Sequence, residues 1–114
     1  MTDKIVVLVT CGSRGEAQKI ARALVEKRLA ACVNIPGARV HSIFRWKGRV
    51  ESAREWLLII KSTRGRMKAL RAEVERLHSY DVPEVIALPV AGGAPRYLAW
   101  VAEAVRPARG GRKK

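Results

Sequence analysis

The densest group of chemically versatile side chains lies in residues 78–90. His78 is one of only two histidines, and a tyrosine and two carboxylates follow it closely: Tyr80, Asp81 and Glu84. Imidazole and carboxylate groups both ligate divalent metals, and imidazole together with thiolate suits copper and zinc. The stretch is therefore a candidate binding site. Its alternative interpretation is a contact between subunits.

The remaining soft or borderline ligands are Cys11, Cys32 and His41. Cys11 is expected between the end of a strand and the start of a helix, where a thiol pKa is lowered and the thiol becomes reactive. The alternative is a small, buried, inert side chain. Cys32 lies in an apolar run and is predicted to be part of the core, and His41 is predicted to be solvated on the polar face of a hairpin.

Motifs for other chemistry are absent from the sequence. Neither C-x-x-C nor H-x-x-x-H occurs, which argues against a structural zinc site. G-x-S-x-G, H-E-x-x-H and a phosphate-binding P-loop are also missing. Residues 12–15 (Gly-Ser-Arg-Gly) precede a helix and could hold an anion on free N–H groups, without a full motif to support it. We predict that the protein is not an enzyme.

Composition predicts one domain and a basic tail. The chain has 114 residues and a net charge of +13. Residues 106–114 carry five Lys or Arg and no acid, which leaves +8 on residues 1–105. We predict a single domain over 1–105 and a disordered basic tail over 106–114, with nucleic acid contacted only non-specifically by the tail. No apolar run approaches the ~20 residues of a membrane helix, so we predict a cytoplasmic protein with reduced thiols and no membrane contact.

The first half of the chain reads as strand, helix and an interrupted strand. Residues 4–11 form a valine-rich run typical of a buried strand. Ser13 and Glu16 match the capping box S-x-x-E, which predicts that a helix begins there. Residues 30–35 begin a second strand, which the Pro-Gly pair at 36–37 interrupts with a turn or bulge.

A long hairpin follows. Alternating apolar and polar residues from position 38 predict a strand, and Lys47-Gly48 predicts a tight turn. The return strand is predicted over 49–62. Its residues 56–60 (Trp-Leu-Leu-Ile-Ile) are apolar on both faces, so we expect both faces to be covered.

Two helices and one more strand complete the chain. Ser62 or Thr63 is predicted to cap a helix whose core stripe comprises Met67, Leu70, Val74 and Leu77. A strand is predicted over 82–89. Because proline lacks an N–H, Pro83 and Pro89 place it at a sheet edge or mark its ends. Pro95 suits the first turn of a third helix, whose inward residues are predicted to be Leu98, Val101, Ala102 and Val105.

The order β-α-β-β-α-β plus a terminal helix predicts an α+β fold, the ferredoxin-like sandwich, with a long central hairpin. At ~3.3 Å per residue the return strand would span roughly 45 Å, about twice a common strand. The outer hairpin carries Phe44, Trp46 and Val50. An isolated two-stranded ribbon is barely stable in water, so these residues need a partner surface, most simply another copy of the chain. We predict oligomerisation at the sheet edges.

Several segments together resemble the CutA family of divalent-cation tolerance proteins: residues 9–11, 24–35, 46–48, 60–63, 78–90 and 97–100. The resemblance covers roughly residues 4–105. It implies a ferredoxin-like subunit in a tight homotrimer, with each long hairpin extending a neighbour's sheet. It also implies binding of divalent metals, copper in particular, and a role in tolerance to metal ions without enzymatic activity.

The resemblance leads to specific site predictions. His78 matches the histidine of the family, and we predict His78 and Cys11 as ligands of a weakly bound Cu²⁺ or other divalent cation, completed by a neighbouring subunit. The alternative for His78 is a cap at a helix end, where an imidazolium is favoured. Ser79 stands where family members usually have proline. Val9 stands where some members carry a cysteine implicated in copper binding.

Two rival functions remain open. The subunit plan also resembles PII-like signalling trimers, which bind small anions between subunits. Separately, Glu84 and Tyr80 could line a cleft between subunits, with Lys61 as a ligand group in the same cleft. The alternative is a purely structural role for each residue: Tyr80 packs at a subunit contact, Glu84 pairs with an arginine and Lys61 is solvated. The strand order is also that of RNA-binding RRM domains, but these display stacking aromatics, and here aliphatic residues follow Trp56.

Overall fold

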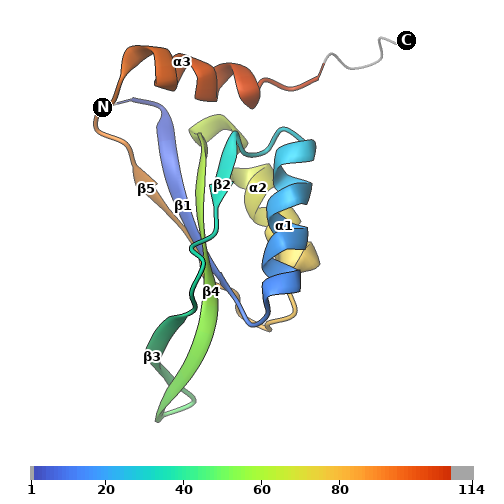
Figure 1. The fold of residues 1–114 in the computed structure, drawn as a ribbon, viewed down its shortest axis with the longest axis vertical. Coiled ribbons are helices and arrows are strands. Elements are labelled where there is room, and N and C mark those ends of the chain that lie inside the picture. Colours follow the sequence, from blue (N-terminus) through green and yellow to red (C-terminus); the bar gives the residue numbers. More distant parts are fainter. Residues whose placement is uncertain (1, 109–114) are drawn as a thin grey trace.

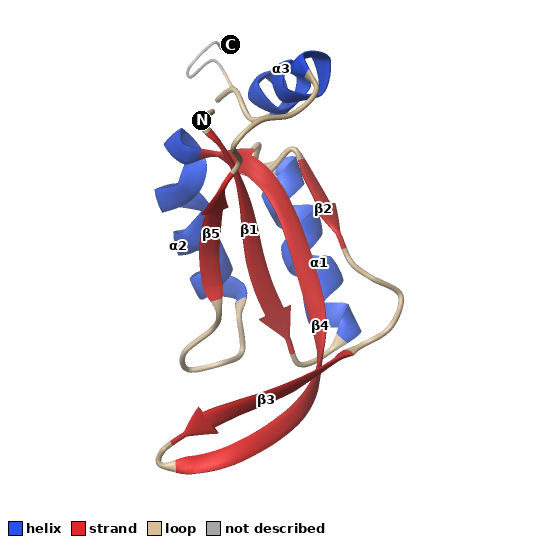
Figure 2. Ribbon diagram, turned by 90° about the vertical axis from the view of Figure 1, so that its left-hand side faces the viewer, coloured by secondary structure: helices blue, strands red, loops and turns tan. Residues whose placement is uncertain are grey.

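An antiparallel sheet with two helices on one face and a third at its end makes up the fold (Figures 1 and 2). The computed structural model describes residues 2–108. Its elements are, in chain order, β1 Lys4–Cys11, α1 Arg14–Glu26, β2 Cys32–Asn34, β3 Val40–Trp46, β4 Arg49–Thr63, the 3-10 turn η1 Arg64–Arg66, α2 Met67–Leu77, β5 Val85–Pro89 and α3 Pro95–Ala104. The strand order is β2-β4-β1-β5, and β3 pairs only with β4. The α+β prediction is confirmed, whereas most of the predicted tail lies outside the described residues.

The core lies between the sheet and the helices α1 and α2. Alternate residues of β1 point into it, and Ile5, Val7 and Val9 are buried there. They pack with Leu58 and Ile60 of β4 and with the inner faces of the two helices, where the buried residues are Ala17, Ile20, Leu24, Leu70 and Val74. The stripe predicted for the helix α2 from the 3.6-residue period therefore packs into the core, with Leu70 and Val74 buried and Met67 and Leu77 partly buried.

The opposite face of the sheet has no helix across its centre. Val6 and Leu8 of β1 lie on this face, beside Leu88 and Ile86 of β5 in the register. Ile86 is 51% and Leu88 47% exposed. Figure 2 shows α1 and α2 behind the sheet and α3 only at its upper end. Leu57 and Ile59 of β4 are half-buried on the same face. The expectation that both faces of residues 56–60 are covered is therefore met only in part within the single chain, and we call this surface the open face.

The outer part of β3 and β4 projects beyond the sheet as a two-stranded arm (Figure 1). Its turn has two central residues, Lys47 with φ 52° and Gly48 with φ 79°, which confirms the predicted tight hairpin. Positive φ at both positions defines the turn type whose twist matches the flanking strands. Ile43 and Val50 on the arm are about as exposed as polar surface residues, at 70% and 68%.

Helix starts follow the local sequence in two of three cases. The Ser13 hydroxyl accepts a hydrogen bond from the Glu16 N–H at 3.1 Å, which confirms the predicted start of α1. Pro95 opens α3 as predicted. Neither Ser62 nor Thr63 caps α2, because η1 intervenes and Arg66 occupies the cap position. The Ser62 hydroxyl instead donates to the Leu29 carbonyl at 2.6 Å.

Two further boundaries differ from the prediction. The strand expected over 82–89 begins only at Val85, because the residues around Pro83 form a loop. In α3, Val101 and Val105 are buried against Ala31 as expected, but Ala102 is exposed and Ala104 takes its place. Within residues 2–108, no helix is long and apolar enough to span a membrane.

Candidate functional site

A hollow of about 720 Å³ lies where the hairpin leaves the sheet, and we call it the hairpin groove. It is lined by Thr10 and Glu55 of the sheet, by hairpin residues Ser42, Ile43, Phe44 and Trp46, and by loop residues Tyr80, Asp81, Val82, Pro83 and Glu84. Three of these side chains are carboxylates, and none of the described lining residues is Lys or Arg. In a chain of net charge +13, this is a local acidic site.

Tyr80 and Glu55 are joined at the inner end of the groove. The Tyr80 hydroxyl donates to Glu55 Oε2 at 2.7 Å, and Glu55 is only 7% exposed. Burial raises the pKa of Tyr80 well above its usual value, and the hydrogen bond to Glu55 adds to this. Gly12 permits the approach, because a Cβ at that position would lie 3.2 Å from the Tyr80 hydroxyl.

Glu84 is the second acidic group whose ionisation is affected by the groove. Burial raises its pKa, and the neighbouring negative charge of Glu55 raises it further, while a hydrogen bond with Thr10 acts in the opposite direction. A carboxylate whose charge is disfavoured by burial and by a neighbouring acid is stabilised when a cation binds beside it. The groove therefore offers a cation two oxygen ligand groups from one chain.

His78 stands at the C-cap of α2, but its ring points to the end of β1. Nε2 lies 2.7 Å from the Thr10 carbonyl oxygen, which can only accept, so Nε2 donates. Nδ1 accepts from the Tyr80 N–H at 3.1 Å. The side chain is fully buried. Both ring nitrogens thus have partners, with Nε2 as the donor and Nδ1 as the acceptor.

Glu16 holds the loop that follows His78. Its carboxylate accepts from the Ser79 N–H at 2.6 Å and from the Ser79 hydroxyl at 2.8 Å, and it lies 3.4 Å from His78 Nδ1. Only one half of the predicted capping box forms, because the Glu16 carboxylate bonds to Ser79 and not to the N–H of Ser13. Proline at position 79 would have no N–H to donate.

Cys11 is fully buried at the end of β1. Burial raises its pKa to about 12, and the negative charges of Glu16 and Glu55 contribute in the same direction. The structure therefore confirms the alternative of a small, buried, inert side chain, because desolvation and nearby carboxylates outweigh the effect of the adjacent helix N-terminus on the thiol pKa. At neutral pH the side chain is a protonated thiol.

The predicted ligands do not form a preformed metal centre in one chain. Across residues 2–108, no three His, Cys, Asp or Glu side chains lie close enough to hold one ion. A metal at His78 would need one ring nitrogen to give up its present partner, and one at Cys11 would need the thiol to lose its proton. His41 is exposed on β3, where it lies opposite Arg54. Cys32 was predicted to be part of the core, but it is only half-buried and lies outside the core cluster, because β2 is the edge strand beside β4. Lys61 hydrogen-bonds to Asn34.

Sequence reasoning missed Glu55, Thr10 and the carboxylate role of Glu16. Glu55 carries a detectable signal, because it alternates with Leu57 and Ile59 and therefore points to the same face as these apolar residues. An acid in such a register indicates a partner or a ligand. No sequence signal identifies the Thr10 carbonyl as the acceptor for His78, because that contact joins residues 68 positions apart.

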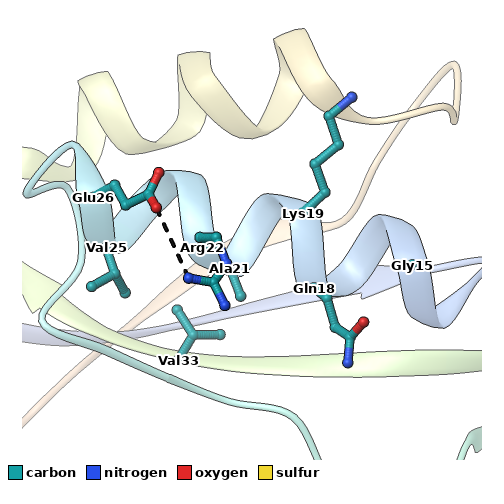
Figure 3. Close-up of a pocket in the computed structure, with 8 residues that line it drawn as sticks. All are labelled: Gly15, Gln18, Lys19, Ala21, Arg22, Val25, Glu26 and Val33. Atoms are coloured by element: carbon teal, nitrogen blue, oxygen red, sulfur yellow. Dashed lines mark ion pairs between the residues drawn. The ribbon is translucent and has the colours of Figure 1, made fainter.

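A second hollow, of about 620 Å³, lies between α1 and β2 (Figure 3). Ala21, Val25 and Val33 form its apolar part, and Arg22 pairs with Glu26 at 4.0 Å along its side. Lys19 and Gln18 extend from the same helix. It contains none of the predicted ligands.

Comparison with known proteins identifies the family of this chain. The family model described as CutA1 divalent ion tolerance protein matches residues 5–104, so the chain belongs to that family. It is 50% identical over 99 residues to the divalent-cation tolerance protein CutA of Thermus thermophilus, an alignment that covers 86% of this chain and 94% of the relative. A solved structure of a divalent cation tolerance protein from Thermus thermophilus superposes with a TM-score of 0.86 at 48% identity, covering 89% of this chain and 97% of that one.

Relatives from other organisms differ in length and in the location that their names give. Protein CutA, chloroplastic, of Arabidopsis thaliana is 47% identical over 90% of this chain, which spans only 56% of that protein. The structure of the periplasmic divalent cation tolerance protein CutA from Archaeoglobus fulgidus has a TM-score of 0.86 at 38% identity, covering 90% of this chain and 99% of that one. The chain likewise spans only 52% of protein CutA of Mus musculus, so it covers about half the length of these two relatives.

Proposed function

We propose that the chain acts in divalent-cation tolerance as a non-catalytic homotrimer that binds divalent metal ions, Cu²⁺ among them. Family membership supports the tolerance role, since the matched family is described by it. The observation that carries self-association is the open face, where Ile86 and Leu88 are half exposed, together with Ile43 and Val50 exposed on the projecting hairpin. The number of three copies follows from the family resemblance. Large apolar surfaces of this kind mark contacts between proteins.

The hairpin groove supports metal binding at such a contact. It lies on the open face, since Glu55 shares that face with Leu57 and Ile59. A neighbouring hairpin or sheet edge packed there would add ligands to Glu55 and Glu84. Carboxylates bind many divalent ions, whereas imidazole and thiolate favour copper. His78 and Cys11 remain predicted ligands. They are an alternative ligand set to the groove carboxylates Glu55 and Glu84.

Calorimetric titration with Cu²⁺ tests the proposal on the full chain. Wild type is compared with His78→Ala, Cys11→Ala and Glu84→Gln, and Glu103→Gln on α3 serves as the matched control. Loss of binding in Glu84→Gln alone places the ion in the groove, and loss in His78→Ala or Cys11→Ala places it at the family histidine or the thiol. Absence of heat with wild type contradicts metal binding.

We also propose a cytoplasmic location. The two free cysteines fit a reducing compartment. Fractionation of cells that express the tagged chain, with a periplasmic and a cytoplasmic marker protein, checks this, and recovery with the periplasmic marker would refute it.

The rival functions find less support. Anion binding in the manner of a signalling trimer needs cations in the cleft, and the described lining of the hairpin groove has only carboxylates as charged groups. RNA binding in the manner of an RRM needs stacking aromatics on the sheet. The central residues of the open face are aliphatic: Val6, Leu8, Leu57, Ile59, Ile86 and Leu88.

A further inference from the structure

The positive charge of the protein is concentrated in the layer of α1, η1 and α2. The two segments that form this basic layer, residues 14–28 and 64–77, hold ten Lys or Arg and four Glu, a net charge of +6. The remainder of residues 1–105 carries only +2 of its +8. Both helices, α1 and α2, lie on one side of the sheet (Figure 1), so these charges, which are dispersed along the sequence, belong to elements on that side.

Of the four acids in the basic layer, Glu16 and Glu73 are engaged and largely buried, whereas Glu26 and Glu75 are exposed and leave the layer its net charge of +6. Glu73 is held by Arg76 at 2.7 Å and by Lys27 at 2.9 Å. The Glu16 carboxylate is turned to Ser79. Lys19, Lys68 and Arg71 are exposed and form no ion pair within residues 2–108. A strong positive potential therefore faces solvent on this side.

The composition of the basic layer indicates which kind of polyanion it suits: a membrane surface, a single-stranded nucleic acid or a duplex. The large apolar side chain exposed on it is Val25, which is too little apolar surface for a helix that inserts into a membrane interface. The large aromatic residues exposed in the described chain lie on the hairpin, on the loop after α2 and on α3, so the layer has no platform on which single-stranded bases could stack. Cations without aromatics suit the phosphates of a duplex.

We propose that the basic layer is a docking surface for the phosphate backbone of double-stranded nucleic acid, bound without sequence preference. At 1.5 Å per residue, the thirteen residues of α1 span about 20 Å, a length over which a duplex carries about twelve phosphate charges. The layer lies on the sheet face opposite the open face, so a subunit contact on the open face leaves it accessible. This surface is separate from the basic tail.

A titration of a labelled duplex of about 20 base pairs at several salt concentrations tests the proposal on the full chain. The layer variant combines Lys19→Gln, Arg22→Gln, Lys68→Gln and Arg71→Gln. The control variant removes the same charge elsewhere, with Arg39→Gln, Lys47→Gln, Arg54→Gln and Arg96→Gln. All eight side chains are exposed, so both variants are expected to fold, and circular dichroism verifies this.

Each released phosphate contact lowers the salt slope of log K by about 0.9, so the layer variant should lose about 3 to 4 from the slope and bind about tenfold or more weakly. The control variant should change far less. Equal losses in both variants would show that binding follows net charge and would overturn the proposal. Preference for single strands or for anionic vesicles over the duplex would overturn it as well.

The same comparison is repeated with both variants in a chain that lacks residues 106–114. The difference in duplex binding between the two variants must persist there. Loss of that difference would assign the binding to the tail and refute the proposed docking surface.

Discussion

At the scale of single residues, the hairpin groove is defined by a buried acid and its donor. Glu55 is almost fully buried at the foot of the hairpin, and the Tyr80 hydroxyl is its hydrogen-bond partner at 2.7 Å. A buried carboxylate without a donor loses solvation that nothing replaces. The pair therefore ties the loop after α2 to the sheet, and it sets the position of Glu84 in the same groove.

Removal of the Tyr80 hydroxyl should destabilise the fold. Tyr80→Phe keeps the ring but leaves Glu55 without its donor, for which we expect a loss of about 1–3 kcal/mol in the free energy of unfolding. Tyr97→Phe is the matched control, because that hydroxyl lies on the exposed side of α3. Urea unfolding followed by circular dichroism measures both. Equal stability of Tyr80→Phe and wild type would show that the hydrogen bond is energetically silent.

The ion pairs of Glu73 should make the stability of the fold decrease at acidic pH. Arg76, followed by Lys27, holds the pKa of Glu73 at about 2, below its ordinary value of 4.5. A lowered pKa contributes stability above pH 4.5, and this contribution is lost as pH falls through 4.5 towards 2. Since both cations are more than half exposed, screening limits the effect to about 1 kcal/mol.

Glu73→Gln should remove this part of the pH dependence. We expect the variant to be less stable than wild type at pH 7 and equally stable near pH 2, with urea midpoints as the measurement. Glu75→Gln, on the exposed side of the same helix, serves as the control. A constant difference between Glu73→Gln and wild type at all pH values would contradict the ion-pair account.

The site could be predicted from sequence only in part at this scale. Tyr80 and Glu84 stand together in residues 78–90, and the structure places both in one groove. The chemistry of Cys11 could not be predicted, because its pKa depends on burial and on Glu16 and Glu55, which no local pattern places beside it. The contact of Ser79 with Glu16 was equally hidden, since Glu16 fitted a capping box that only half forms.

At the scale of elements, the sequence predicted correctly those helix starts, strands and turns that depend mainly on local residues. The buried strand β1, the Ser13 cap, the Lys47-Gly48 turn and the Pro95 helix start all appear as expected. The start of α2 could not be predicted from Ser62 and Thr63, because tertiary contacts take the Ser62 hydroxyl to Leu29. The late start of β5 has a similar origin, since the loop around Pro83 lines the groove.

The hairpin turn should depend on Gly48. Its φ of 79° suits glycine, and a side chain in this left-handed region costs about 1–2 kcal/mol. Gly48→Ala should therefore lower the free energy of unfolding by about 1 kcal/mol. Gly65→Ala is the control, because Gly65 has no positive φ and its Cβ would meet open space. Equal effects of both substitutions, measured by thermal unfolding, would contradict the turn assignment.

At the scale of the whole molecule, two faces of one sheet have opposite character. The helix layer buries the core on one side and carries most of the positive charge of residues 1–105. The other side is aliphatic and has no helix across its centre, and the hairpin projects from it (Figure 2). An aliphatic surface beside an unsupported two-stranded arm is unfavourable in water. The uncovered side is therefore where copies of the chain should meet.

The open face could not be predicted from periodicity alone. Residues 56–60 are apolar at every position, and such a run indicates burial on both sides without saying whether a helix or another subunit provides it. The predicted oligomer followed instead from the length of the hairpin and its exposed aromatic residues. The structure adds the specific residues, Ile86 and Leu88, at which a contact can be broken.

The most direct test of the proposed trimer is the solution mass of the full chain by light scattering after gel filtration. A homotrimer should have a mass near three times 12.6 kDa. The variant Ile86→Glu with Leu88→Glu, which places charges on the open face, should have a much smaller mass. Lys68→Glu with Arg71→Glu, on the helix layer, should keep the wild-type mass. A wild-type mass of one chain, with the open face left in water, would contradict the account.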